Sequence, residues 1–180
     1  GSCEDAYQHA TNVDNLDFVA VTDHSNSFDN ADSASISDGS MSEEWKEGHA
    51  LATQYTTSGF VCIYGFEMTW SNGLGHINTF NTEGFQSRTQ NEYKTYSTAL
   101  QNYYATLKTQ PDSISQFNHP GTTFGDFSDF AYYDEEIDKL ITTIEVGNGE
   151  GAIGSSGYFP SYEYYQRALD KGDGELADNG

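Results

Sequence analysis

Several apolar segments of this chain run directly into an acid or a histidine. The residues at which they end are Asp23 with His24, Glu67, His119 and Glu145. Apolar segments without strict alternation are typical of parallel strands covered on both faces. Ligands of such sheets gather beyond the carboxyl ends of the strands. We therefore expect these acids and imidazoles to converge on one pocket.

The donor types in this set favour a metal site. Carboxylates and imidazoles without a cysteine pair suit zinc, manganese or iron. His76 opens an alternating segment, and we expect it near the tip of a hairpin. His9 and His49 lie within predicted helices and lack a partner at metal-ligand spacing. We expect a surface side chain for His9 and a side chain between a helix and the sheet for His49.

Hydrophobic periodicity and end signals predict the elements that hold these residues. The predicted strands are 17–22, 60–66, 76–80, 114–118 and 141–144, and the predicted helices are 3–13, 42–56, 90–108 and 162–171. The segments 25–40 and 124–133 are expected to be loops that shape the pocket entrance. The acidic residues from Asp170 onward are expected to form a solvated tail.

Length and charge limit the classes of function. The 180 residues suffice for one domain with a real core. The formal net charge is −21, from 28 acidic and 7 dispersed basic residues, so nucleic acid and acidic membrane surfaces would be repelled. We expect neither as a partner, and an anionic substrate would need metal ions to hold it.

The sequence gives weaker evidence on the cellular location of the protein than on its class of function. No apolar run approaches the ~20 residues of a membrane-spanning helix and no signal-peptide pattern is present, so we expect a soluble chain. Low Lys content with abundant Tyr, Asn, Ser, Thr and Gly favours an extracellular or cell-surface bacterial protein. Cys62 lies in a predicted buried strand, which favours a reduced thiol, and a Cys3–Cys62 disulfide is the alternative.

Several motifs together resemble the PHP (polymerase and histidinol phosphatase) superfamily of metal-dependent hydrolases, and within it the carbaryl-hydrolase-like branch. They are DFVAVTDHS at 17–25, GFEMT at 65–69, GHIN at 75–78, NHPG at 118–121, IEVGN at 144–148 and ALDKG at 168–172. The resemblance implies that the metal ligands are His24, Glu67, His76 and His119. It implies that Asp23 is a ligand or orients one, and that Glu145 lines the pocket.

The resemblance also implies an α/β fold, a distorted (β/α)7 TIM-like barrel with up to three metal ions. The family's His-x-His motif, expected before the segment 17–25, and its Asp-x-His motif, expected after the segment 168–172, are not found within these 180 residues. We therefore expect a single PHP-like domain over 1–180, as a fragment of a longer protein that lacks the first and last barrel strands here. Such a site would hold one or two ions.

Two functions from different classes follow. The first is a metal-dependent hydrolase that uses a metal-activated water on a small-molecule phosphoester or related ester. The alternative is a catalytically incomplete PHP-like module that serves as a surface or binding scaffold. The sequence leaves the substrate, the metal and the oligomeric state open.

Overall fold

The computed structural model describes residues 2–28, 34–71, 73–89, 96–149, 158–160 and 162–178. Parts of two predicted elements, 29–33 and 90–95, therefore lie outside the described residues. The helices are α1 (Cys3–Asn12), α2 (Ile36–Gly39), α3 (Glu43–Tyr55), α5 (Tyr96–Lys108), α6 (Phe127–Phe130), α7 (Glu135–Leu140) and α8 (Tyr162–Asp178). The strands are β1 (Phe18–His24), β2 (Val61–Thr69), β3 (His76–Phe80), β4 (Ile114–Asn118), β5 (Ile141–Ile144), β6 (Gly147–Gly149) and β7 (Tyr158–Pro160). None of the helices in the described ranges is long and apolar enough to span a bilayer.

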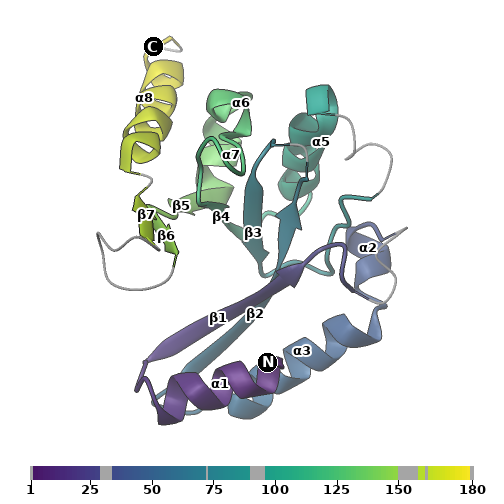
Figure 1. The fold of residues 1–180 in the computed structure, drawn as a ribbon. Coiled ribbons are helices and arrows are strands. Elements are labelled where there is room, and N and C mark those ends of the chain that lie inside the picture. Colours follow the sequence, from purple (N-terminus) through teal and green to yellow (C-terminus); the bar gives the residue numbers. More distant parts are fainter. Residues whose placement is uncertain are drawn as a thin grey trace.

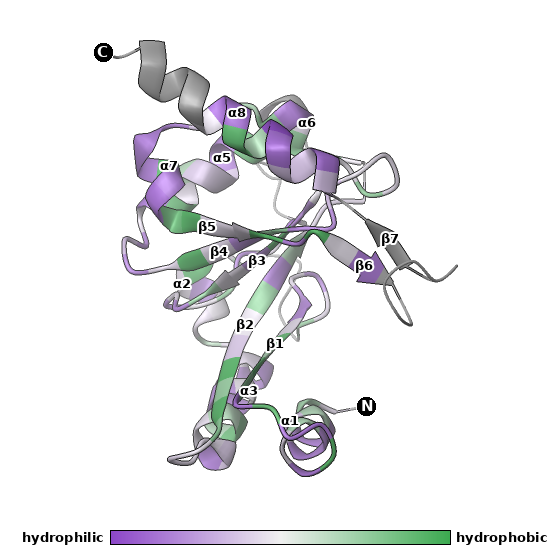
Figure 2. Ribbon diagram, turned by 90° about the vertical axis from the view of Figure 1, so that its left-hand side faces the viewer, coloured by the Kyte–Doolittle hydropathy of each residue, from purple (hydrophilic) through white to green (hydrophobic). Residues whose placement is uncertain are grey.

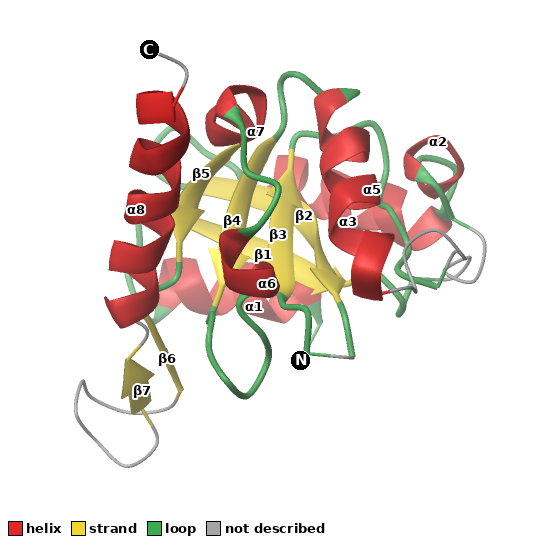
Figure 3. Cartoon of the chain, turned by 90° about the horizontal axis from the view of Figure 1, so that it is seen from above, coloured by secondary structure: helices red, strands yellow, loops and turns green. Residues whose placement is uncertain are grey.

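Five strands form one open sheet in the order β1-β2-β3-β4-β5 (Figures 1 and 3). β1 is parallel to β2 and β4 is parallel to β5, whereas β3 is antiparallel to both of its neighbours. β6 and β7 pair separately as a two-stranded antiparallel sheet. The α/β class is thus confirmed, with a mostly parallel sheet whose described edges are β1 and β5.

The main helices pack on one face of this sheet, which we call the outer face. α1 and α3 lie below β1 and β2 in Figure 1, and α5 and α7 lie above β3, β4 and β5. Alternation along the strands sorts the side chains, since successive residues point to opposite faces. Phe66 and Met68 of β2, Ile77 of β3 and Phe117 of β4 are all buried on the outer face.

Local signals fix the helices that cover β1 and β2. Ser2 and Asp5 form a capping box at the start of α1. The Ser42 side chain caps α3 by accepting a hydrogen bond of 3.2 Å from the backbone N–H of Trp45. Gly48 of α3 faces the Tyr64 ring, where a Cβ atom would lie 2.1 Å from ring carbons. The missing side chain lets the helix approach β2 closely.

The opposite face of the sheet, the inner face, lacks a helical cover in the described part of the chain. Phe18 is 65% exposed, Val61 is 47% exposed and Ile114 is 51% exposed. Figure 2 shows that β2 is apolar over most of its length, including the end beside α3. The expectation that the first strand is covered on both faces is therefore wrong for the described residues, because β1 has one strand neighbour and helices on one side only.

Three further expectations need correction. The acidic segment 170–178 continues α8 instead of forming a tail. The predicted loops 25–40 and 124–133 contain the short helices α2 and α6, and α7 had no sequence prediction. α8 is anchored by Arg167, which donates hydrogen bonds to Asp126, the N-cap residue of α6, and to Asp129 within α6. Cys3 and Cys62 are both free thiols.

Asp134 illustrates how one side chain supports the β4–β5 half of the fold. Its Oδ1 caps α7 by accepting hydrogen bonds from the backbone N–H groups of Glu136 (3.1 Å) and Ile137 (2.9 Å), and its Oδ2 pairs with Lys108 of α5. Partial burial acts to raise the pKa of Asp134, but the bonds from Lys108 and from these N–H groups outweigh it and hold that pKa below its ordinary value.

We predict that Asp134→Ala lowers the free energy of unfolding by about 1 kcal/mol at pH 7, as expected for the loss of a helix cap. Because the pKa is lower in the folded state, this contribution is present above the unfolded value and disappears as the pH falls through the folded pKa, below about pH 4. Urea unfolding at pH 7 and pH 3 measures both effects. Glu136→Ala removes a charge near the same lysine without removing the cap, and equal losses for the two variants would contradict the prediction.

Candidate metal centre

Four of the side chains selected from the sequence meet at one rim of the inner face. His24 is the last residue of β1, Glu67 lies near the end of β2, and His76 is the first residue of β3. His119 follows β4 directly. Because β3 runs antiparallel, its first residue reaches the same rim as the carboxyl ends of β1, β2 and β4.

Glu67 lies at the centre of this group. Its Oε2 is 3.2 Å from Nε2 of His24, and its Oε1 is 3.8 Å from Nδ1 of His76. The register places Glu67 opposite His24 on β1, and Thr69 opposite His76 on β3. Thr69 also donates its hydroxyl to Oε2 of Glu67 at 2.6 Å, and Asn118 donates its amide to Oε1 at 2.7 Å.

The two inner histidines contact each other and an acid. Nδ1 of His76 lies 2.9 Å from Nε2 of His119. Nδ1 of His119 and the His119 backbone N–H lie 2.8 and 2.9 Å from Oε2 of Glu145, the residue after β5. A carboxylate only accepts hydrogen bonds, so Nδ1 of His119 is the donor and Nε2 is left as an acceptor. Asn148 donates to the other oxygen of Glu145 at 2.7 Å.

Burial and hydrogen bonds shift the pKa of two residues at this rim, His76 and Glu145. The side chains of Glu67, His76 and His119 are 10, 12 and 13% exposed, whereas that of His24 is 58% exposed. Burial lowers the pKa of His76. The nearby carboxylate of Glu67 acts to raise this pKa, whereas the imidazoles of His119 and His24 act to lower it further. Burial acts to raise the pKa of Glu145, but hydrogen bonds from His119 and Asn148 outweigh it and hold that pKa below its ordinary value.

One group in the described ranges has the geometry of a metal site. It consists of Glu67, His76 and His119, which each offer a ligand atom such that all three atoms lie within 4.8 Å of one another. Neutral imidazole is the form that binds a metal, and the lowered pKa of His76 favours it at neutral pH. Two imidazoles and a carboxylate fit zinc, manganese or iron.

Backbone strain and an aromatic ring border the group. His119 has a φ of 30°, which is unusual for a residue with a side chain. The ring of Phe124, from the segment 121–126, lies 5.2 Å from His76 and 4.6 Å from His119, measured between ring centroids. Phe124 therefore forms one wall beside the two histidines.

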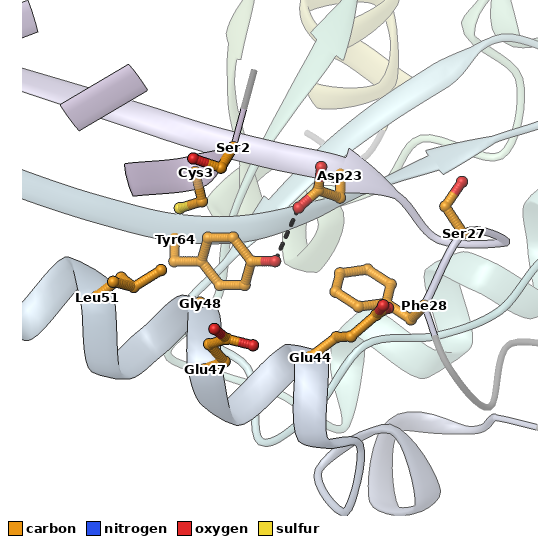
Figure 4. A pocket seen from close by; sticks show the side chains of 10 residues that line it. All are labelled: Ser2, Cys3, Asp23, Ser27, Phe28, Glu44, Glu47, Gly48, Leu51 and Tyr64. Atoms are coloured by element: carbon orange, nitrogen blue, oxygen red, sulfur yellow. Dashed lines mark hydrogen bonds between the residues drawn. The ribbon is translucent and has the colours of Figure 1, made fainter. Parts of the chain in front are cut away.

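Asp23 lies apart from this group. It precedes His24 on β1, so its side chain points to the outer face, where Tyr64 donates its hydroxyl to Oδ2 at 2.8 Å (Figure 4). Burial and the bond to Asp23 raise the pKa of Tyr64 well above its usual range, so the tyrosine remains the donor. A pocket of about 310 Å³ surrounds this pair, and its walls include Cys3 and Glu47.

The other two histidines also lie outside the group. His9 is exposed on α1, with Nε2 3.6 Å from Asp14. His49 of α3 packs between the rings of Trp45 and Tyr64, with centroid distances of 4.5 and 5.4 Å. Both placements agree with the sequence expectation.

Three residues of the site were not selected from the sequence. They are Thr69, Asn118 and Asn148. A signal existed for two of them, since Thr69 is two residues from Glu67 and so shares its face, and Asn118 ends a strand beside His119. The loop 124–133 was expected to border the pocket, and its first residue, Phe124, lies beside His76 and His119.

Comparisons with known proteins add one finding. No family model matches the chain, and no curated protein matches it. Among solved structures, the fold is similar to that of a two-domain protein from Bacteroides vulgatus, described as containing a predicted PHP-like metal-dependent phosphoesterase, with a TM-score of 0.51 and 22% identity. The match covers 94% of this chain and 44% of that chain, so this chain spans less than half of that protein's length. At this level of identity, the likeness shows that the two chains share a fold.

Proposed function

We propose that this chain forms the metal-binding part of a PHP-type hydrolase that acts on a phosphoester or a related ester. The observation that carries the proposal is the cluster of Glu67, His76 and His119 at one rim of a sheet whose fold is similar to a predicted PHP-like phosphoesterase. The carbaryl-hydrolase-like branch rests on the sequence motifs alone and remains part of the proposal.

In this proposal Glu67, His76 and His119 hold a divalent ion, and His24 contributes from the open side of Glu67. When bound, such an ion would polarise the ester and activate water at neutral pH. The seven basic residues of the chain are outnumbered by acids, so an anionic substrate group would depend on that positive charge. Zinc, manganese and iron all suit this donor set.

Glu145 has a positioning role in this scheme. It accepts hydrogen bonds from both the ring and the backbone of His119, which fixes the ring orientation and keeps Nε2 turned toward His76. Carboxylates that orient metal-binding histidines in this way are a recurrent feature of metal sites. The proposal assigns no contact with the ion to Asp23, because its side chain lies on the outer face.

The uncovered inner face supports a barrel as the architecture of the complete site. A barrel places its helices outside and its apolar side chains inside, and the open face here carries the exposed Phe18, Val61 and Ile114. We propose a distorted (β/α)7 barrel of PHP type in which further strands cover this face. An extracellular or cell-surface location is proposed on composition alone.

One observation favours the scaffold alternative. The side chain of His24 is 58% exposed, and in the described ranges the group with ligand atoms within 4.8 Å of one another has three members, fewer than a site for several ions needs. A chain with this ligand set could retain one ion as a structural group and bind a partner without catalysis.

The first test is metal binding. We expect zinc to bind this chain near neutral pH and to be released below about pH 6, as the imidazoles protonate. Removal of a residue that only hydrogen-bonds to a metal ligand weakens metal binding by about 10- to 100-fold. His119→Ala and Glu67→Gln change the ligands themselves, so each should weaken zinc binding by more than this. Isothermal titration measures both variants, with His9→Ala as the matched control. A wild-type chain that binds no zinc, manganese or iron would rule out the proposed centre.

The second test separates catalysis from metal binding. Glu145→Gln should leave the metal content unchanged and lower turnover by about 10- to 100-fold, because it loosens a ligand's orientation without removing the ligand. His119→Ala should abolish turnover together with metal. The assay uses a chromogenic phosphate monoester, a phosphodiester and a carboxyl ester, with this chain and with any longer natural protein that contains it. Metal-loaded protein that hydrolyses none of them would favour the scaffold.

A further inference from the structure

A chain of side-chain hydrogen bonds runs along the inner face toward Glu67. Thr143 of β5 donates to Oε1 of Gln116 at 3.3 Å, and Gln116 donates its amide to Oδ1 of Asn118 at 2.9 Å. Asn118 in turn donates to Oε1 of Glu67 at 2.7 Å. Every bond points the same way, from the edge strand toward the buried carboxylate.

The last of these bonds crosses an entire strand. Asn118 belongs to β4 and Glu67 to β2, and β3 lies between them in the sheet. Two strand spacings separate the two strands by roughly 10 Å in a flat sheet, and the two side chains meet over β3 on the inner face. Asn118 and Glu67 are 3 and 7% exposed, which makes the orientation of each group energetically important.

The orientation of the Asn118 amide is a choice between two states. A half turn of the amide exchanges its donor and acceptor ends, and the acceptor end would repel the carboxylate of Glu67. The amide of Gln116 holds Oδ1 of Asn118 and thereby excludes the wrong state. Gln116 is itself oriented by Thr143.

We propose that Gln116 and Asn118 are positioning residues that hold the Glu67 carboxylate in its metal-binding orientation, with Gln116 acting through Asn118. Thr69 fixes the second oxygen of Glu67 at 2.6 Å, so both oxygens are directed, Oε1 toward His76 and Oε2 toward His24. The inference rests on the proposed function, since it assumes that Glu67 is a metal ligand.

The test is a double-mutant cycle in metal affinity. Asn118→Ala should weaken zinc binding by about 10- to 100-fold, in the range found for outer partners of metal ligands. Gln116→Met keeps the side-chain volume, removes the lock on Asn118 and should weaken binding severalfold. If Gln116 acts through Asn118, the double variant should bind as Asn118→Ala does. Titration with zinc, and the visible absorption spectrum of bound cobalt, report affinity and ligand geometry independently of activity.

Asn78→Ala is the matched control. Asn78 is the register partner of both Glu67 and Gln116 on the same face, and its Oδ1 has no hydrogen-bond partner among the described residues. Its loss should change neither the affinity nor the cobalt spectrum. Circular dichroism of the metal-free variants checks the fold. If Asn118→Ala unfolds, the zinc affinity and cobalt spectrum of Gln116→Met alone test the positioning role.

The possible results are distinct. A wild-type chain that binds no metal overturns the proposed function, on which this inference rests. A wild-type chain that binds metal while Asn118→Ala and Gln116→Met bind equally well overturns the positioning role only. Effects of the two substitutions that simply add would show that Gln116 does not act through Asn118, which overturns the connected path.

Discussion

A buried carboxylate is costly unless donors or cations surround it, and this constraint organises the rim of the sheet around Glu67. Thr69 and Asn118 supply donors to its two oxygens, while His24 and His76 approach from the neighbouring strands. Four strands must therefore end in fixed relation to one another. A metal ion among these groups would complete the compensation, because it adds positive charge where the carboxylate and imidazoles already converge.

The face of the sheet that the helices cover decides where this convergence lies. In the described part of the chain the helices pack along one face, so the outer face carries the large buried aromatic and aliphatic side chains and the inner face carries polar groups near the rim. Side chains from strands two apart touch on the inner face, as Asn118 and Glu67 do across β3. The position of the site therefore follows from the packing of α3 and α5 on the far side of the sheet. The same five strands therefore form the sheet and position the side chains of the site.

Sequence reasoning located the strand ends but not all the directions of their side chains. His24, Glu67, His76 and His119 meet because each sits at the predicted end of a strand or hairpin. Asp23 does not join them, because adjacent residues on a strand point to opposite faces of the sheet. The two-residue period of a strand already predicts that Asp23 and His24 lie on different faces. Contacts between strands two apart, such as that of Asn118 with Glu67, depend on the order of the strands in the sheet, which no local pattern encodes. Helix α8 extends to Asp178, beyond its prediction, and the bonds of Arg167 that join it to α6 are long-range contacts that no local pattern reports.

Strained backbone is concentrated beside this site. His119 has a φ of 30°, and Phe127 to Phe130 all have positive φ, each costing of order 1–3 kcal/mol for residues with side chains. The surroundings compensate: Phe127 is fully buried against Phe117 and donates its N–H to the carbonyl of Leu74 at 2.8 Å, and α8 holds the turn through Arg167. Strain of this kind persists only where packing overdetermines it. Here it lies in the segment that follows Phe124, the ring beside His76 and His119, and in His119 itself. Residues held in such conformations cluster at functional sites, so the strain at His119 is a further observation in favour of the proposed centre.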